Sequence, residues 1–262
     1  MSDGKYEKGG LNMAHYDPKL LAVNCSLLAG QLLIENGANM ERVNDTMYRI
    51  AENAGLHSFQ AFTTVTGIVV SAEHQSNAQA VDIRARHNDL SKVARVNEIS
   101  RQFATKEINL SEMYNQLKRV DKGTPQLSVF TQCIGAAVLS LSLMIVFTGD
   151  VRDSWAAFII GGTCYWMYLY LLWKFKVKYM GEFVSSLLIG LLAIMTTKLG
   201  WTSNLNDIII GSVMPLVPGV PLTNAARDLV SGNLISGPTR ALEAIITAMA
   251  IGCAIVIVLR YA

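Results

Sequence analysis

Residues 214–228 constrain the fold most, because they break a segment that is otherwise apolar enough to lie in a membrane. Pro215, Pro218 and Pro221 recur every three residues around Gly219. Each proline lacks a backbone N–H and clashes with the preceding turn, so a regular helix cannot continue through all three. In a bilayer, broken backbone is stable only where protein or a water-filled cavity satisfies its polar groups. The stretch is therefore typical of the discontinuous helices that form substrate sites in transporters.

The distribution of charge divides the chain into a polar first half and an apolar second half. Hydrophobic residues make up 51% of the chain and charged residues only 16%, against about 25% charged in an ordinary soluble domain. Most charges fall within residues 1–125, and residues 127–147, 154–173 and 208–226 contain none. The net charge is +2 without a basic tract, so we expect no nucleic-acid partner.

The cysteines and the N-terminus exclude several other classes. Cys25, Cys133, Cys164 and Cys253 are widely spaced and form no C-x-x-C pair, which favours free thiols over a zinc site or a disulfide. We expect no metal site and no cofactor. Residues 1–16 are polar and lack the apolar core of a signal peptide, so we expect a disordered tail there.

The apolar half contains five segments of the length that a bilayer demands, about 20 residues each. Basic residues such as Lys122, Lys174 and Arg227 fall in loops that all lie on one side of the predicted spans, which places the N-terminus in the cytoplasm and the C-terminus outside. Five spans put the two ends on opposite sides, as in one half of an inverted-repeat transporter. The predicted spans are residues 127–147, 154–173, 182–199, 205–222 and 234–259.

The polar half predicts a compact domain of mixed helices and strands. Helical patterns cover four segments, and a run rich in Val, Thr and Phe at 59–72 predicts a hairpin that turns at Thr66-Gly67. A third strand is expected at 81–86. We therefore predict an α+β cytoplasmic domain at 17–125, followed by an all-α membrane domain of five transmembrane helices at 126–262. The four expected helices are residues 17–37, 39–55, 89–104 and 111–120.

Several titratable residues of the polar half could serve acid–base chemistry, but their spacing matches no metal or nucleotide motif. A solvated charged surface explains most of them more simply. A membrane-anchored enzyme, or a sensor, with its active site in the α+β domain remains the alternative to transport. The candidates are Glu35, Asp45, His57, His74 and His87.

The residues after the break predict a ligand site. A new helix is expected from about Thr223, and the free amides of its N-terminus would favour a carboxylate. Thr223 and Arg227 share one face of that helix, as do Asn224 and Asp228. Arg227 can hold a carboxylate with two hydrogen bonds, and Asp228 could bind a substrate ammonium group or a coupling proton. An interfacial charge pair is the simpler alternative. The predicted substrate-binding residues are Pro218, Gly219, Pro221, Thr223, Asn224, Arg227 and Asp228.

Four motifs make the whole chain resemble the threonine/serine exporter family, in its shorter form with an N-terminal domain and five spans. The long proline motif at 216–232 is the most specific of the four. The cytoplasmic motifs lie at 35–47, 62–68 and 86–97, and the residues that carry them include Glu35, Gly37, Arg42, Asp45, Thr66 and Gly67.

The resemblance implies export of small carboxylates across a bacterial inner membrane, driven by the proton motive force. Both threonine/serine and succinate are substrates associated with the family. Some members of the family are split into a long subunit such as this chain and a short membrane subunit. We therefore expect that short subunit, a small carboxylate, protons and the lipid bilayer as partners, with a homo-oligomer as the alternative.

Overall fold

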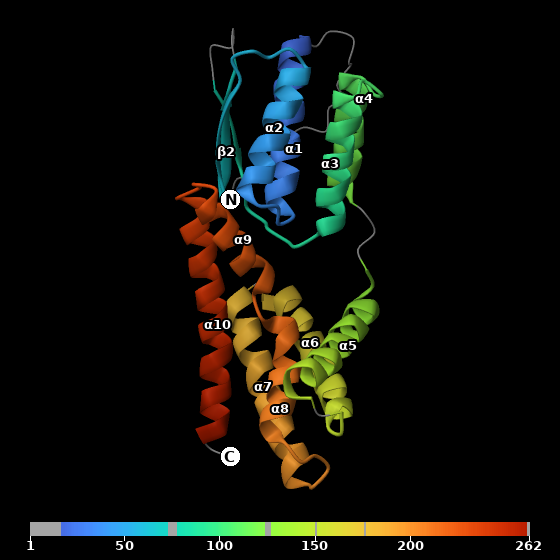
Figure 1. Cartoon of the computed structure of the whole chain (residues 1–262), viewed down its shortest axis with the longest axis vertical. Helices are drawn as coiled ribbons and strands as arrows, with labels where there is room; N and C mark the ends of the chain where they lie inside the picture. The colour runs from blue at the N-terminus through green and yellow to red at the C-terminus, as the bar shows by residue number, and fades with distance from the viewer. Residues whose placement is uncertain (1–16, 73–77, 124–126, 150, 176, 261–262) are drawn as a thin grey trace. The chain divides into compact units, whose positions relative to one another are not determined.

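The computed structural model describes residues 17–72, 78–123, 127–149, 151–175 and 177–260, so the expected tail at 1–16 lies outside the described residues. The chain divides into two compact units. The first comprises residues 1–124 and 227–237, and the second comprises residues 125–226 and 238–262. Figure 1 labels the elements and colours the chain by residue number, from blue at the N-terminus to red at the C-terminus.

Four helices of the first unit begin and end where local sequence signals place them. They are α1 (Pro18–Glu35), α2 (Met40–Asn53), α3 (Leu90–Ala104) and α4 (Leu110–Lys122). Asp17 caps α1 by accepting a hydrogen bond from the Lys19 amide, and Asp89 caps α3 in the same way. These short carboxylates satisfy amides that have no partner inside the helix.

A small antiparallel sheet completes the first unit, in the strand order β1-β2-β3. The strands are β1 (Gln60–Thr64), β2 (Gly67–Ser71) and β3 (Gln79–Asp82). The hairpin lies where the sequence predicted it, but the third strand begins and ends earlier than the expected 81–86. Pairing stops at Asp82 because β2 begins at its partner Gly67, and Ile83 then bonds to Thr66 in the turn.

The core of the first unit is built around α1. Buried side chains lie on every face of this helix, because α2, α3, α4 and β2 all pack against it. Leu32, Leu33 and Ile34 are consecutive and each at most 1% exposed, which an amphipathic surface helix would not allow.

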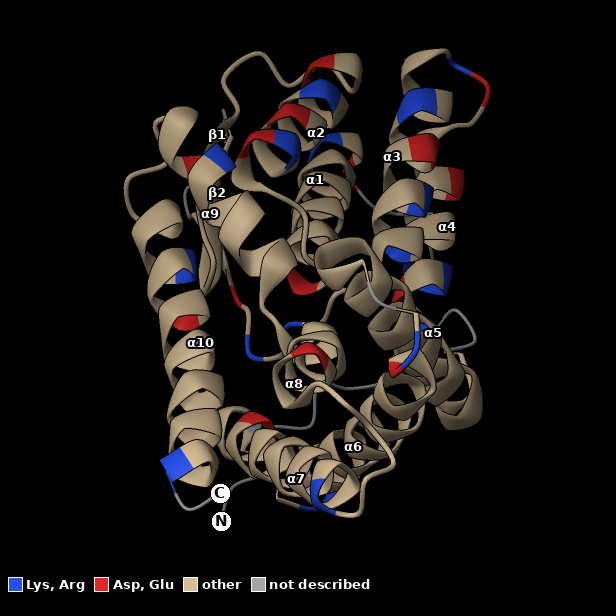
Figure 2. Cartoon of the chain, turned by 60° about the horizontal axis from the view of Figure 1, so that its bottom comes forward, with Lys and Arg blue, Asp and Glu red and all other residues tan. Residues whose placement is uncertain are grey.

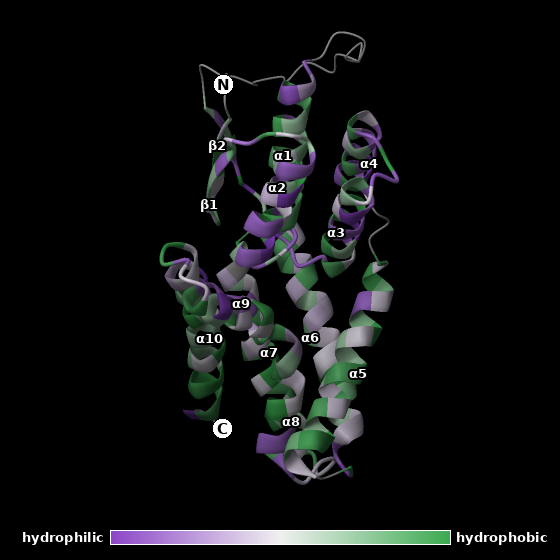
Figure 3. Cartoon of the chain, turned by 45° about the horizontal axis from the view of Figure 1, so that its top comes forward, coloured by the Kyte–Doolittle hydropathy of each residue, from purple (hydrophilic) through white to green (hydrophobic). Residues whose placement is uncertain are grey.

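The second unit consists of apolar helices, as the sequence predicted. α5 (Val129–Thr148), α6 (Ser154–Phe175), α7 (Lys178–Lys198) and α10 (Ser236–Arg260) are each long and apolar enough to cross a membrane. A bent pair of helices supplies a fifth span if it is counted as one. Figure 2 shows that charged residues gather on α2, α3 and α4 and are sparse along these apolar helices, and Figure 3 shows the matching contrast in hydropathy. The predicted order, an α+β region followed by membrane helices, is confirmed.

Small residues allow the helices of the second unit to approach closely. α8 (Leu205–Val213) packs against α5, α6 and α7. A Cβ atom placed on Gly161 would lie 2.1 Å from Oγ of Ser140, and one placed on Gly211 would lie 2.9 Å from the Ser140 carbonyl oxygen. Glycine is therefore required where α5, α6 and α8 meet. α10 approaches α7 where Val258 packs on Gly190.

Candidate functional site

The proline stretch forms a sharp break between two helices. α8 leads into a 3-10 turn, η2 (Met214–Leu216), and α9 (Gly219–Val230) follows with a bend of 62°. The second helix starts four residues before the expected position near Thr223. It can do so because Pro221 falls in its first turn, where the missing N–H would have had no helical partner.

Tight local turns replace the hydrogen bonds that the prolines cannot make. The Gly211 carbonyl accepts from the Met214 amide, and the Met214 carbonyl accepts from the Val217 amide at 3.2 Å. The Val217 carbonyl in turn accepts from the Gly219 amide at 2.8 Å. The break is therefore a defined structure, as backbone in a membrane must be.

The first turns of α9 present an open polar face. Nothing lies within 4 Å of a Cβ atom placed on Gly219. The exposed Thr223 donates its hydroxyl to the Gly219 and Val220 carbonyls at 3.0 Å each, which leaves its oxygen lone pairs for a ligand. One turn on, Arg227 is exposed and forms no ion pair with the described residues.

Asp228 has a different environment from its neighbour. Its side chain is completely buried, and Oδ1 accepts a hydrogen bond of 2.8 Å from the Met40 amide at the start of α2. Asn39, the local cap residue, makes no such bond with its side chain. A carboxylate is favoured at a helix N-terminus, so Asp228 acts as the cap of α2. The residues are 188 apart in sequence, which is why helix-cap rules could not find the pair.

The motif around Glu35 and Gly37 holds the same end of α2. Gly37 ends α1 with φ +88°, and a Cβ atom there would lie 2.7 Å from Oδ1 of Asn88. The Glu35 carbonyl accepts from the His87 amide at 2.6 Å. On the other side, the Ser231 hydroxyl bonds to Oε2 of Glu41 at 3.1 Å. Segments from three of the four motifs therefore meet at the N-terminus of α2.

Thr66 and Gly67 belong to the hairpin turn. Thr64 closes the turn with its hydroxyl, which accepts from the Gly67 amide and donates to the Gly67 carbonyl at 3.0 Å each. A Cβ atom on Gly67 would lie 3.2 Å from the Val81 carbonyl oxygen of β3. The geometry gives both residues a structural role in the turn.

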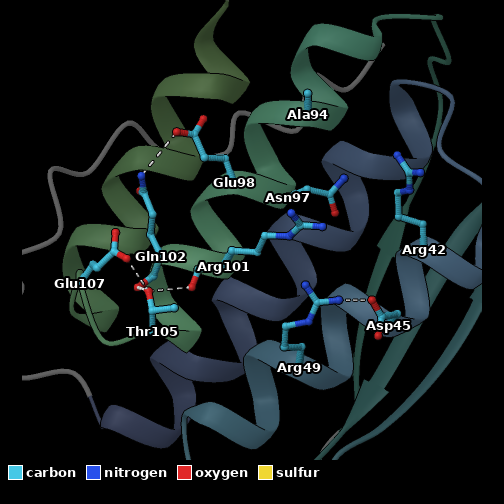
Figure 4. Close-up of a pocket in the computed structure, with 10 residues that line it drawn as sticks. All are labelled: Arg42, Asp45, Arg49, Ala94, Asn97, Glu98, Arg101, Gln102, Thr105 and Glu107. Atoms are coloured by element: carbon cyan, nitrogen blue, oxygen red, sulfur yellow. Dashed lines mark hydrogen bonds and ion pairs between the residues drawn. The ribbon is translucent and has the colours of Figure 1, made fainter.

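Arg42 and Asp45 line a charged groove of about 470 Å³ between α2 and α3 (Figure 4). Asp45 pairs with Arg49 on the same helix, and Thr46 bonds to Asn97 across the two helices at 3.2 Å. No histidine or cysteine is present among the lining residues. The full lining is Arg42, Asp45, Arg49, Ala94, Asn97, Glu98, Arg101, Gln102, Thr105 and Glu107.

The remaining described candidates for enzyme chemistry do not lie together in one site. His57 and His87 are exposed and do not line the groove, and His74 lies outside the described residues. Glu35 accepts a hydrogen bond from Gln31 of its own helix at 2.8 Å. The described residues of the first unit therefore offer charged groups for binding and no paired nucleophile and base.

A family model described as "putative threonine/serine exporter" matches residues 24–262. The chain belongs to this exporter family. No curated protein and no solved structure matched it. Membership indicates a multi-pass membrane protein whose work is transport rather than enzymatic catalysis, with threonine and serine as the substrates that the family name gives.

Proposed function

We propose that the chain is one subunit of an inner-membrane exporter for small carboxylates, either threonine and serine or succinate, driven by the proton motive force. The observation that carries the proposal is the 62° break between α8 and α9 in a member of an exporter family. Discontinuous helices near the middle of a membrane are the usual substrate sites of secondary transporters.

The substrate carboxylate binds at the N-terminal half of α9. Pro218, Gly219 and Pro221 keep the backbone open there, while Thr223 and Asn224 supply polar side chains on the first turns. Arg227 anchors the carboxylate with its planar, two-pronged guanidinium group. Its exposure and its lack of an ion pair with the described residues support this role. Asp228, which caps α2, holds the C-terminal end of α9 in place through that hydrogen bond.

The membrane orientation follows from the basic loops: the N-terminus is cytoplasmic and the C-terminus is external. Labelling from outside intact cells should reach a cysteine introduced at position 262 and spare one at position 10. Labelling at position 10 would overturn this orientation.

A second, short membrane subunit completes the pathway. Large apolar side chains are exposed along the spans, including Phe130, Trp173 and Met249, and a broken helix needs neighbours on every side. Five spans correspond to one half of an inverted repeat. A homo-oligomer of this chain is the competing assembly.

The deciding experiment is counterflow of labelled substrate in proteoliposomes, tested over amino acids and dicarboxylates. We expect exchange when the chain is reconstituted with the short subunit and little without it. Full export by the chain alone, unchanged when the short subunit is added, would contradict the two-subunit assembly.

The same assay tests the anchor. We expect Arg227→Ala to abolish exchange and Arg227→Lys to restore only part of it, because an ammonium group lacks the planar fork. Wild-type exchange by a correctly inserted Arg227→Ala protein would show that Arg227 does not bind the substrate.

A further inference from the structure

The buried face of α7 changes from polar to apolar along its length. Glu182 is 3% exposed, and Ser185 and Ser186, which follow it by one turn, are 0% exposed. Ile189 and Ala193 continue the same face and are also fully buried. Glu182 belongs to the segment that is apolar enough to cross the membrane, roughly 6 Å along the helix from its start.

Aromatic hydroxyl groups of α6 lie beside this polar face. The ring of Tyr168 would contact a Cβ atom on Gly181 at 3.4 Å, and Gly181 directly precedes Glu182 in α7. The Tyr165 ring centroid is 5.8 Å from that of Tyr168. A carboxyl group, two phenols and two serine hydroxyls are thus gathered inside the second unit.

The two serine hydroxyls can each still form hydrogen bonds. In the part of the chain that the structure describes, neither Oγ of Ser185 nor Oγ of Ser186 has a hydrogen-bond partner. Alanine would serve helix packing equally well, and burying a hydroxyl without a partner costs about 1–3 kcal/mol. The pair is therefore better explained by a group that binds there during function, such as water that carries a proton.

Among the described residues, two other buried carboxylates bond to backbone amides at the start of a helix, whereas Glu182 lies farther along its own helix. Asp153 accepts hydrogen bonds from the Ser203 and Asn204 amides, and Asp228 from the Met40 amide. Glu182 is the fifth residue of α7, one position beyond the four amides that a helix leaves free. Ionisable residues buried within a span usually serve transport of ions or protons.

We propose that Glu182 is the residue that binds and releases the coupling proton of export. Its carboxylate takes one proton from water on one side of the membrane and returns the same proton to water on the other side. Tyr168, Ser185 and Ser186 supply the hydrogen bonds through which that proton reaches and leaves the carboxyl group. This inference rests on the proposed exporter function, because a coupling site requires transport.

Other titratable or charged groups lie on the elements that pack against α7, and they must be controlled for. α6 contributes two tyrosines near Glu182 and a lysine at its far end, and α8 contributes one aspartate at its start. α10 carries an arginine and a glutamate in its first turns. They include Tyr165, Tyr168, Lys174, Asp207, Arg240 and Glu243, with Tyr179 on α7 itself.

The test separates coupling from transport, using both subunits in proteoliposomes. Substrate counterflow is measured at equal pH on both sides, and substrate accumulation is measured under an imposed pH gradient. We expect Glu182→Gln to retain counterflow while gradient-driven accumulation falls about tenfold or more, the range of a typical coupling energy. Asp207→Asn, which neutralises a half-buried carboxylate on the neighbouring helix, should leave both measurements unchanged.

Each result has a distinct meaning. Absence of counterflow in the wild type would contradict the exporter function itself. Wild-type counterflow together with full gradient-driven accumulation by Glu182→Gln would overturn the coupling role, and so would accumulation driven by a sodium gradient at equal pH. If the Gln variant does not fold, Tyr168→Phe decides, because weakened coupling supports the proposal and full coupling overturns it.

Discussion

The cores of the two units differ in the size of the side chains that form them. In the first unit, large side chains such as Leu33, Met47 and Ile99 fill a core that removes apolar surface from water. In the second unit, α5, α6 and α8 meet through Gly161 and Gly211. Lipid is as apolar as leucine, so helices there gain from close contact rather than from burial. The first core can adjust by moving side chains, whereas the second brings backbones together.

Both units nevertheless use the same device to fix a helix end. Asp228 caps α2 in the first unit, and Asp153 caps α8 in the second by accepting from the Ser203 and Asn204 amides at 2.7 and 2.8 Å. In each case the carboxylate comes from a segment far away in sequence. The difference between the units therefore lies in packing and not in capping.

The largest expected effect tests the difference in packing. Gly211→Ala would place Cβ 2.9 Å from the Ser140 carbonyl oxygen, and backbone cannot move aside. Gly30→Ala in the first unit meets Sδ of Met47 at 2.4 Å, at the flexible end of a side chain. We expect Gly211→Ala to cost about 3 kcal/mol, at the upper end for overpacking, and Gly30→Ala less.

The melting temperature of the detergent-solubilised protein, followed by size-exclusion chromatography, measures both changes. Gly252→Ala is the matched control, because nothing lies within 4 Å of its Cβ position and it carries the same gain in helix propensity. Equal melting temperatures for the Gly211 and Gly252 variants would contradict the conclusion that α8 contacts the backbone of α5 at Gly211.

A smaller effect is expected from removing the caps. Asp228→Ala leaves the Met40 amide without its acceptor, and Asp153→Ala does the same to two amides of the second unit. Loss of a cap typically costs about 0.5–2 kcal/mol. The Asn variants keep an acceptor oxygen and should lose less. Hydrogen exchange at Met40 is the direct measurement, and unchanged protection in Asp228→Ala would refute the cap.

The smallest expected effect is a difference in the order in which two buried thiols, one in each unit, become accessible to a reagent. Cys25 and Cys164 are both 0% exposed, and Cys133→Ser with Cys253→Ser removes the other thiols. In urea we expect a maleimide to label Cys25 before Cys164, because the first unit unfolds in water while detergent still supports the membrane helices. Labelling in the reverse order would contradict the proposed difference between the two cores.

The same thiol predicts a pH dependence for the first unit. Burial raises the pKa of the Cys25 thiol from 9.0 to about 12. Between these values the folded state keeps the proton and the unfolded state releases it, so the free energy of unfolding falls as pH rises above 9.0. The free energy of unfolding is measured by urea titration at pH 8 and at pH 10. In Cys25→Ala we expect a smaller fall in this free energy between the two pH values than in the wild type.

Local patterns in the sequence were sufficient for the helices and the hairpin, because caps such as Asp17 and Asp89 and turns such as Thr66-Gly67 act within a few residues. They were also sufficient to locate the break at the three prolines. They could not assign Asp228, whose partner Met40 is distant in sequence. Glu182 was also missed, because a lone carboxylate at the start of an apolar run looks like an interfacial charge until its burial is known.

The 62° bend also sets how thick a bilayer the chain can match. The residues of α8 and η2 rise about 18 Å, and α9, tilted by this angle, adds about 8 Å along the same axis, so the pair reaches about 26 Å against roughly 30 Å of hydrocarbon. The four long helices are each long enough to cross the full thickness. Counted as one span, the pair is shorter than the hydrocarbon layer, so we expect the bilayer to thin around it and lipid chain length to influence how the break is held open.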